Sequence, residues 1–159
     1  MLFRSLPEIL HQVEYEWRAS ICTARLQCHK HLGVTLRADL RWSDHITEIV
    51  KKSSKLVNIM KSLKFILDRA TLETIYFSFV RPILEYGGPL WSGCTALDES
   101  KLESVQLEAA RVVTGAMCGT SNAKLYEETG WQTLAERREV SKLVLMYKLV
   151  YRLSPGLIC

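Results

Sequence analysis

Proline and glycine are scarce in this sequence, with four prolines and eight glycines in 159 residues. Because proline breaks helices and glycine weakens regular elements, their scarcity leaves room for long helices. Hydrophobic residues make up 48% and charged residues 24%, which excludes a disordered chain and is typical of a globular domain. A chain of this length forms one domain that buries about two-thirds of its unfolded surface.

Long apolar runs and a secretory leader are also missing. The best apolar run, Ile75 to Val80, is far shorter than the ~18 residues of a membrane span. Charge and proline interrupt the opening Met1 to Glu8. Five cysteines, an odd number without a Cys-x-x-Cys pair, disfavour a disulfide framework. We therefore expect no membrane partner and an intracellular protein, cytoplasmic or nuclear.

One short segment concentrates potential metal ligands: Cys22, Cys28, His29 and His31 fall within ten residues. Their spacing fits no common zinc module, and on a strand Cys28 and His29 would point to opposite faces. A metal site there is the minor alternative, and we expect no metal and no cofactor.

The net charge of +4 belongs to a single stretch of the chain. From Arg41 to Arg69 there are seven basic and three acidic residues, whereas the remainder holds fourteen of each sign. Within this stretch Lys51 and Lys55 point away from the apolar residues of a helical pattern, and Lys52 and Lys61 flank them. Lys64 falls inside the apolar stripe. A solvated face and a nucleic-acid contact both fit this pattern.

Hydrophobic periodicity predicts a mainly α fold, a bundle of about five helices preceded by a short two-stranded β element. We divide the chain into an unassigned flank, a β element and a helical region: 1–24, 25–42 and 43–159. The spacing of Ile9, Val13 and Trp17 predicts a short amphipathic helix within 1–20. The predicted strands are 25–28 and 32–36. The predicted helices are 44–67, a second from Asp68 that ends or kinks at Pro82, 98–114, 122–129, and a last one after Thr133 and Glu136.

The same patterns predict which side chains are buried. In the second helix these are Leu72, Ile75, Tyr76, Phe79 and Val80. In the third they are Leu102, Val105, Ala109, Val112 and Val113. In the last they are Leu134, Val140, Leu143, Val144, Tyr147 and Tyr151. Tyr86 and Trp91 are predicted to be buried beside the Gly87-Gly88-Pro89 turn. Arg111, Arg137 and Arg138 are expected on solvated faces.

The order of motifs resembles the region after the palm in LINE-like (non-LTR) retrotransposon reverse transcriptases. The matching residues cover roughly 31–152 and keep the family's order. They are Leu32-Gly33-Val34, Trp42, His45-Ile46, Arg81-Pro82-Ile83-Leu84-Glu85-Tyr86, Trp91, Leu102-Glu103-Ser104-Val105-Gln106, Ala109-Ala110-Arg111, Thr114-Gly115, Arg137-Arg138 and Tyr147-Lys148. Departures are His31, where the family usually shows an aromatic residue, and Gly87, where alanine is common.

The resemblance implies a thumb-like region cut off from its catalytic palm. In this family an aspartate pair and a third aspartate upstream hold two magnesium ions. The four aspartates here, Asp39, Asp44, Asp68 and Asp98, include no adjacent pair, and the last three look like helix-start residues. We therefore expect no enzyme activity.

As a partner we expect nucleic acid, bound weakly and without sequence preference, as the template–primer duplex is in the parent enzyme. The candidate contacts are Lys51, Lys52, Lys55, Lys61 and Arg81. For Arg81, a structural pair with Glu85 and a phosphate contact both remain open. The alternative function is a non-enzymatic helical protein-interaction module or a functionless remnant.

Overall fold

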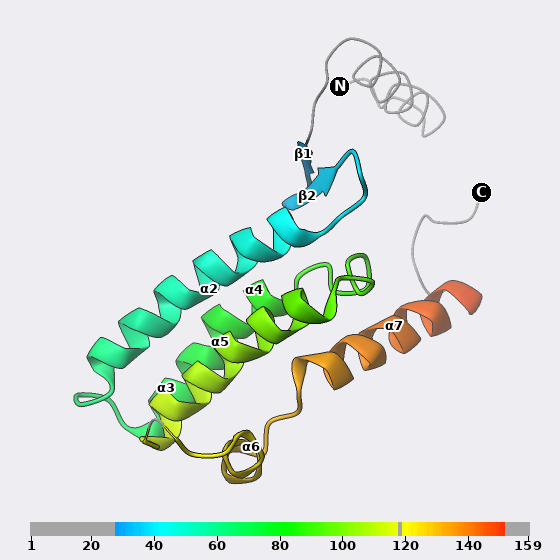
Figure 1. Cartoon of the computed structure of the whole chain (residues 1–159). Coiled ribbons are helices and arrows are strands. Elements are labelled where there is room, and N and C mark those ends of the chain that lie inside the picture. Colours follow the sequence, from blue (N-terminus) through cyan, green and yellow to red (C-terminus); the bar gives the residue numbers. More distant parts are fainter. Residues whose placement is uncertain (1–27, 118, 152–159) are drawn as a thin grey trace, which may run out of the picture. The chain divides into compact units, whose positions relative to one another are not determined.

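The computed structural model describes residues 28–117 and 119–151 of the chain (Figure 1). The chain forms two compact units, residues 1–41 and 42–159. The helix predicted within 1–20 lies outside the described residues, as does Cys22 of the candidate metal cluster. The predicted fold class is confirmed, because in the described residues a two-stranded antiparallel sheet is followed by five helical segments, the unbroken helical stretch 69–85 being counted as one.

The first unit contains a β-hairpin. Strand β1 spans Cys28–His31 and β2 spans Val34–Arg37, with His31 opposite Val34 and Cys28 opposite Arg37. Leu32 and Gly33 form the two-residue turn with φ angles of 46° and 82°. Positive φ at both positions matches the twist of a tight hairpin, and glycine adopts it without strain. The second predicted strand, 32–36, began two residues too early because Gly33 belongs to the turn, and of the first, 25–28, only Cys28 lies among the described residues.

The second unit is helical. Its elements are α2 (Ser43–Leu63), α3 (Arg69–Ile75), the π-helical turn η1 (Tyr76–Val80), α4 (Arg81–Glu85), α5 (Ala96–Thr114), α6 (Asn122–Thr129) and α7 (Leu134–Val150). Helices α2 and α5 lie side by side (Figure 1). Among the described residues, no helix is both long and apolar enough to cross a membrane.

The core lies between α2, the α3–η1–α4 segment and α5. Its fully buried side chains include Ile46 and Met60 from α2, Tyr76 from η1, and Leu102 from α5. The five positions predicted as the inner face of the third helix are all buried. Trp91 joins this core from the loop between α4 and α5. Recurrence of apolar residues at three- and four-residue steps therefore placed the centre of the bundle correctly.

Helix termini follow the sequence at most positions. The side chain of Asp68 accepts a hydrogen bond from the Thr71 backbone N–H at the start of α3. Thr133 and Glu136 form the predicted capping box of α7. Ser43 is not the cap of α2: Trp42 occupies that position, and the Ser43 hydroxyl donates to the Asp98 carboxylate at 3.2 Å. Helix α2 also stops at Leu63, four residues early, so Lys64 is its exposed C-cap.

Pro82 does not end the second helix. The chain remains helical from Arg69 to Glu85, and Pro82 lies in the first turn of α4. The widened turn η1 precedes it, with the Arg81 backbone N–H donating to the Tyr76 carbonyl five residues earlier. A proline lacks the N–H of a regular helix and its ring crowds the preceding turn, which the π-turn relieves. Phe77 lies in this widened turn, and Arg81 directly follows it as the first residue of α4.

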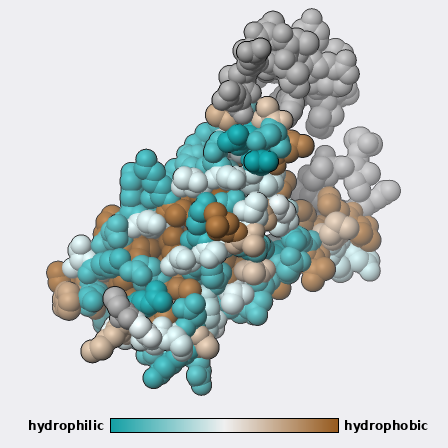
Figure 2. Space-filling view, in the orientation of Figure 1, coloured by the Kyte–Doolittle hydropathy of each residue, from teal (hydrophilic) through white to brown (hydrophobic). Residues whose placement is uncertain are grey.

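Burial differs from prediction in two regions. Phe79 and Tyr86 are exposed, at 60% and 56% respectively, although Trp91 is fully buried as predicted. In α7 only Leu134 of the predicted stripe is buried. The other five are exposed: Val140, Leu143, Val144, Tyr147 and Tyr151. Leu134 and Arg138 instead anchor α7, and Figure 2 shows hydrophobic atoms gathered over the later part of this helix.

Candidate functional site

The exposed face of α2 carries the predicted lysines. Lys51 and Lys55 are exposed on the side opposite the buried Ile49, Ser53 and Val57. No ion pair within residues 28–117 and 119–151 involves either lysine. They lie four residues apart, about 6 Å along the helix axis, and so project from the same face. These two ammonium groups are therefore available to an anionic partner.

Lys52 and Lys61 are engaged by carboxylates. The Lys52 ammonium lies 2.9 Å from Glu48 within α2, and the Lys61 ammonium lies 2.6 Å from Glu108 on α5. The hydrogen bond from Lys61 lowers the pKa of Glu108 below its usual value. Surface pairs of this kind contribute little to stability and exchange readily with other partners. Lys61 nevertheless contacts α5, whereas Lys51 and Lys55 face away from the bundle.

Arg81 belongs to a separate charged cluster. Its Nε donates to Glu85 Oε1 at 3.1 Å, which confirms the predicted pair one helical turn apart. Arg137, from α7, also binds this carboxylate: its Nε donates to Oε1 and its Nη2 to Oε2 at 3.1 Å. One carboxylate is therefore shared by two guanidinium groups, leaving a local surplus of one positive charge. The cluster ties α7 to the end of α4.

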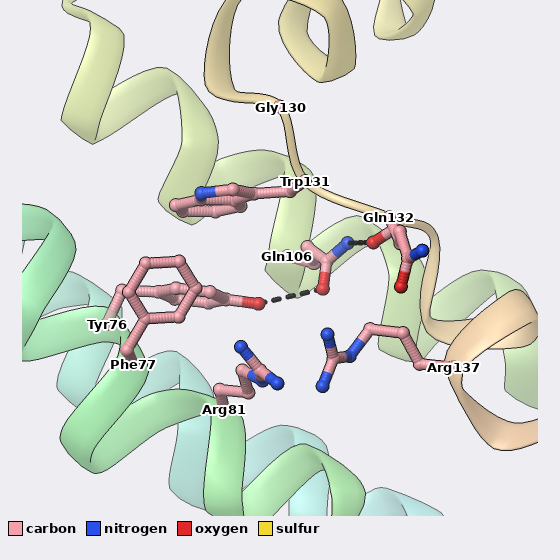
Figure 3. A pocket seen from close by; sticks show the side chains of 8 residues that line it. All are labelled: Tyr76, Phe77, Arg81, Gln106, Gly130, Trp131, Gln132 and Arg137. Atoms are coloured by element: carbon pink, nitrogen blue, oxygen red, sulfur yellow. Dashed lines mark hydrogen bonds between the residues drawn. The ribbon is translucent and has the colours of Figure 1, made fainter. Parts of the chain in front are cut away.

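Above the two arginines lies a small pocket of about 220 Å³ (Figure 3). The Tyr76 and Trp131 rings stack at 4.0 Å between centroids, and Phe77 lies 5.6 Å from Trp131. The Arg81 guanidinium lies over the Phe77 ring at 5.3 Å. Figure 3 shows the guanidinium groups of Arg81 and Arg137 turned toward one another on the opposite side of the pocket from Trp131.

A buried hydrogen-bond chain fixes the inner wall of this pocket. The Tyr76 hydroxyl donates to Gln106 Oε1 at 2.7 Å, and Gln106 Nε2 donates to the Gln132 carbonyl at 2.8 Å. Burial raises the pKa of Tyr76 far above its usual value, so the phenol remains a donor at neutral pH. Gln106 thereby joins η1, α5 and the loop before α7.

Two arginines that the sequence placed on solvated faces have structural roles. Arg138 is only 5% exposed; its Nη2 donates to Glu99 at 2.8 Å and its guanidinium lies 5.4 Å from the Trp91 ring centre. Arg137 lines the pocket. Arg111 is partly buried as well, with 25% of its side chain exposed, and makes long contacts of 3.5 Å with Glu108 and with Asn122 on α6. The partners of Arg137 and Arg138 lie on other helices, so local spacing gave no signal for them.

The structure thus separates the five predicted nucleic-acid contacts into different surroundings. Lys51 and Lys55 share one open face, Lys52 and Lys61 are paired, and Arg81 lies in the pocket cluster near α7. No ion pair or hydrogen bond joins Arg81 to any of these lysines in the described part of the chain.

Three of the aspartates lie at or near the starts of helices. Asp44 lies in the first turn of α2, Asp68 caps α3, and Asp98 is buried near the start of α5. The Lys101 ammonium, 2.9 Å from Asp98, lowers the pKa of this carboxyl. Across residues 28–117 and 119–151, no group of three or more His, Cys, Asp and Glu side chains is placed to hold a metal ion.

No family model, curated protein or solved structure matches this chain. The resemblance to LINE-like reverse transcriptases therefore stays a prediction, carried by the sequence motifs. A helical bundle is compatible with a thumb-like role but is not specific to it, because one fold supports many functions.

Proposed function

We propose that this sequence is the thumb-like helical region of a retrotransposon reverse transcriptase, does not include the palm, and binds nucleic-acid duplexes through their backbone. The observation that carries this proposal is the pair Lys51 and Lys55, exposed on the outer face of α2 and without ion pairs to any described residue. Phosphate groups attract such ammonium groups, and release of counterions drives binding without reading the bases. We also propose an intracellular, cytoplasmic or nuclear, location.

Duplex binding should be weak and strongly dependent on salt. Lys51 and Lys55 each neutralise one phosphate, and Lys52 supplies a third when it leaves Glu48, since an exposed pair of this kind is weak. With about three phosphates neutralised, the logarithm of affinity should fall with the logarithm of salt concentration with a slope of roughly −2 to −3. Fluorescence anisotropy with a labelled RNA–DNA duplex measures this slope.

Two results would contradict duplex binding by this face. One is a slope near zero, which would indicate contacts other than phosphate neutralisation. The other is a difference of more than about tenfold between unrelated duplex sequences, because backbone contacts carry no direct sequence information.

We further propose that this chain has no polymerase activity. Nucleotide addition in the parent family requires clustered carboxylates that hold two metal ions. Asp44, Asp68 and Asp98 instead lie at helix starts, and Asp39 lies after β2 beside Arg37. The purified chain should extend no primer on RNA or DNA templates in magnesium or manganese. Template-dependent incorporation above that of a mock preparation would refute this.

The second candidate function is a protein-interaction module, and the later part of α7 favours it. Eight apolar side chains there are each more than one-third exposed: Val140, Leu143, Val144, Leu145, Met146, Tyr147, Val150 and Tyr151. Contiguous apolar surface of this kind marks interaction sites on many proteins. An absence of duplex binding even at low salt would favour this candidate over the first.

A further inference from the structure

The pocket above Arg81 and Arg137 contains hydrogen-bond donors that no described residue satisfies. The Glu85 carboxylate accepts hydrogen bonds from Nε of Arg81 and from Nε and Nη2 of Arg137. Both Nη groups of Arg81 and the Nη1 of Arg137 make no hydrogen bond within residues 28–117 and 119–151. Because Figure 3 shows both guanidinium groups lining the same pocket, these donors converge on a shared space.

Charge and surroundings favour an anion in that space. Arg81, Arg137 and Glu85 together carry one net positive charge, and their side chains are 32%, 23% and 28% exposed. The aromatic rings of Tyr76, Phe77 and Trp131 form the facing wall. Aromatic walls exclude water, which strengthens a charge-assisted hydrogen bond relative to one on an open surface.

We propose that this pocket binds a phosphate monoester. Its three terminal oxygens point in different directions and can accept hydrogen bonds from two separate guanidinium groups at once. The two coplanar oxygens of a carboxylate instead match the paired N–H groups of a single guanidinium. A phosphate monoester also carries about 1.5 to 2 negative charges at neutral pH, more than the single charge of a carboxylate. The positively charged cluster therefore attracts it more strongly.

The size of the pocket restricts how the ligand enters. Its volume of about 220 Å³ is below the roughly 300–1,000 Å³ of sites that enclose a drug-sized ligand. The phosphate therefore enters end-on, and the rest of the molecule remains outside. A free phosphorylated small molecule and the terminal phosphate of a nucleic-acid strand share this chemistry. The site is distinct from the lysine face of α2 and does not depend on duplex binding there.

The Glu85 carboxylate competes with an incoming anion for the guanidinium groups of Arg81 and Arg137. It holds both guanidinium groups in place, yet its negative charge repels an incoming anion. In Glu85→Gln the amide oxygen still accepts from an arginine while the opposing charge is lost. We therefore expect Glu85→Gln to bind phosphate several-fold more tightly than the unaltered chain. A purely structural role for this cluster would give unchanged or weaker binding.

The test is calorimetric titration of the full chain with inorganic phosphate, a nucleoside 5′-monophosphate and acetate. Arg81→Gln should weaken phosphate binding by about tenfold or more, since it removes charge-assisted hydrogen bonds. Arg81→Lys should recover part of the lost phosphate affinity, because it restores the positive charge but not the paired N–H donors of a guanidinium. Circular dichroism checks that each variant is folded, and the gain in Glu85→Gln gives an independent readout if Arg81→Gln fails to fold.

Single strands with a 5′-phosphate or a 5′-hydroxyl identify the source of the phosphate. Tighter binding of the phosphorylated strand than of the hydroxyl strand assigns the site to strand ends, and equal binding of the two strands assigns it to small phosphorylated molecules. The proposal is overturned if acetate binds as well as phosphate, if no phosphate probe binds, or if Glu85→Gln gives no gain. Failure of duplex binding after changes at Lys51 and Lys55, with phosphate binding retained, would affect the proposed function alone.

Discussion

Trp91→Ala lowers the free energy of unfolding by about 3–5 kcal/mol, the range found for large-to-small changes in a packed core. The Trp91 side chain is fully buried and belongs to the main hydrophobic cluster. Its Nε1 donates to the Tyr86 carbonyl at 2.9 Å, and the Arg138 guanidinium packs over its ring. Truncation therefore leaves a cavity and removes both the hydrogen bond to the Tyr86 carbonyl and the packing against Arg138. Urea denaturation followed by circular dichroism measures the change.

Phe79→Ala provides the matched control. This large aromatic residue was also predicted to be buried, yet its side chain is 60% exposed. Its truncation should change the free energy of unfolding by about 0.5 kcal/mol or less, as surface substitutions usually do. Similar losses in the two variants would show that Trp91 is not the more deeply packed residue. Trp91→Phe retains most of the ring volume and isolates the contribution of the hydrogen bond to Tyr86.

The sequence predicted the bundle well where each helix has one apolar face. In α5 the inward positions recur at three- and four-residue steps, and all five predicted residues are buried. In α7 the spacing of apolar residues does not identify the buried face, because apolar residues lie on two faces of the helix. Val140, Leu143 and Tyr147 have helical spacing, but they are exposed, and α7 docks through Leu134 and the charged residue Arg138, which gives no apolar signal. A periodic pattern identifies a stripe without saying which stripe is covered.

The candidate sites show a similar division. The outward direction of Lys51 and Lys55 follows from helical period alone, and so does the pairing of Arg81 with Glu85 four residues later. The second partner of Glu85 is Arg137, 52 positions along the chain. That contact depends on how α7 docks, which no local pattern encodes. The pocket could not be predicted either, because its walls come from η1, α5 and the loop before α7.

Reversing both charges in Lys51→Glu and Lys55→Glu should abolish duplex binding without unfolding the chain. Each substitution replaces an attraction to phosphate with a repulsion, and only Lys52, already paired with Glu48, remains on this face. Neither lysine makes an ion pair among the described residues, so no native contact is lost. New repulsion with Glu48 and between the two glutamates should destabilise α2 by only about 0.2–0.5 kcal/mol for each pair.

The double variant Lys124→Glu and Lys148→Glu is the control for net charge. Both lysines are exposed, and neither makes an ion pair within the described residues; they lie on α6 and α7. This variant changes the net charge by the same amount while leaving α2 intact. If binding depends on the face of α2, the first variant loses affinity and the control retains most of it at about 0.15 M salt, where a Debye length of about 8 Å limits distant charges. Equal losses would instead indicate a nonspecific response to total charge, and unchanged affinity in the first variant would place the duplex on another surface.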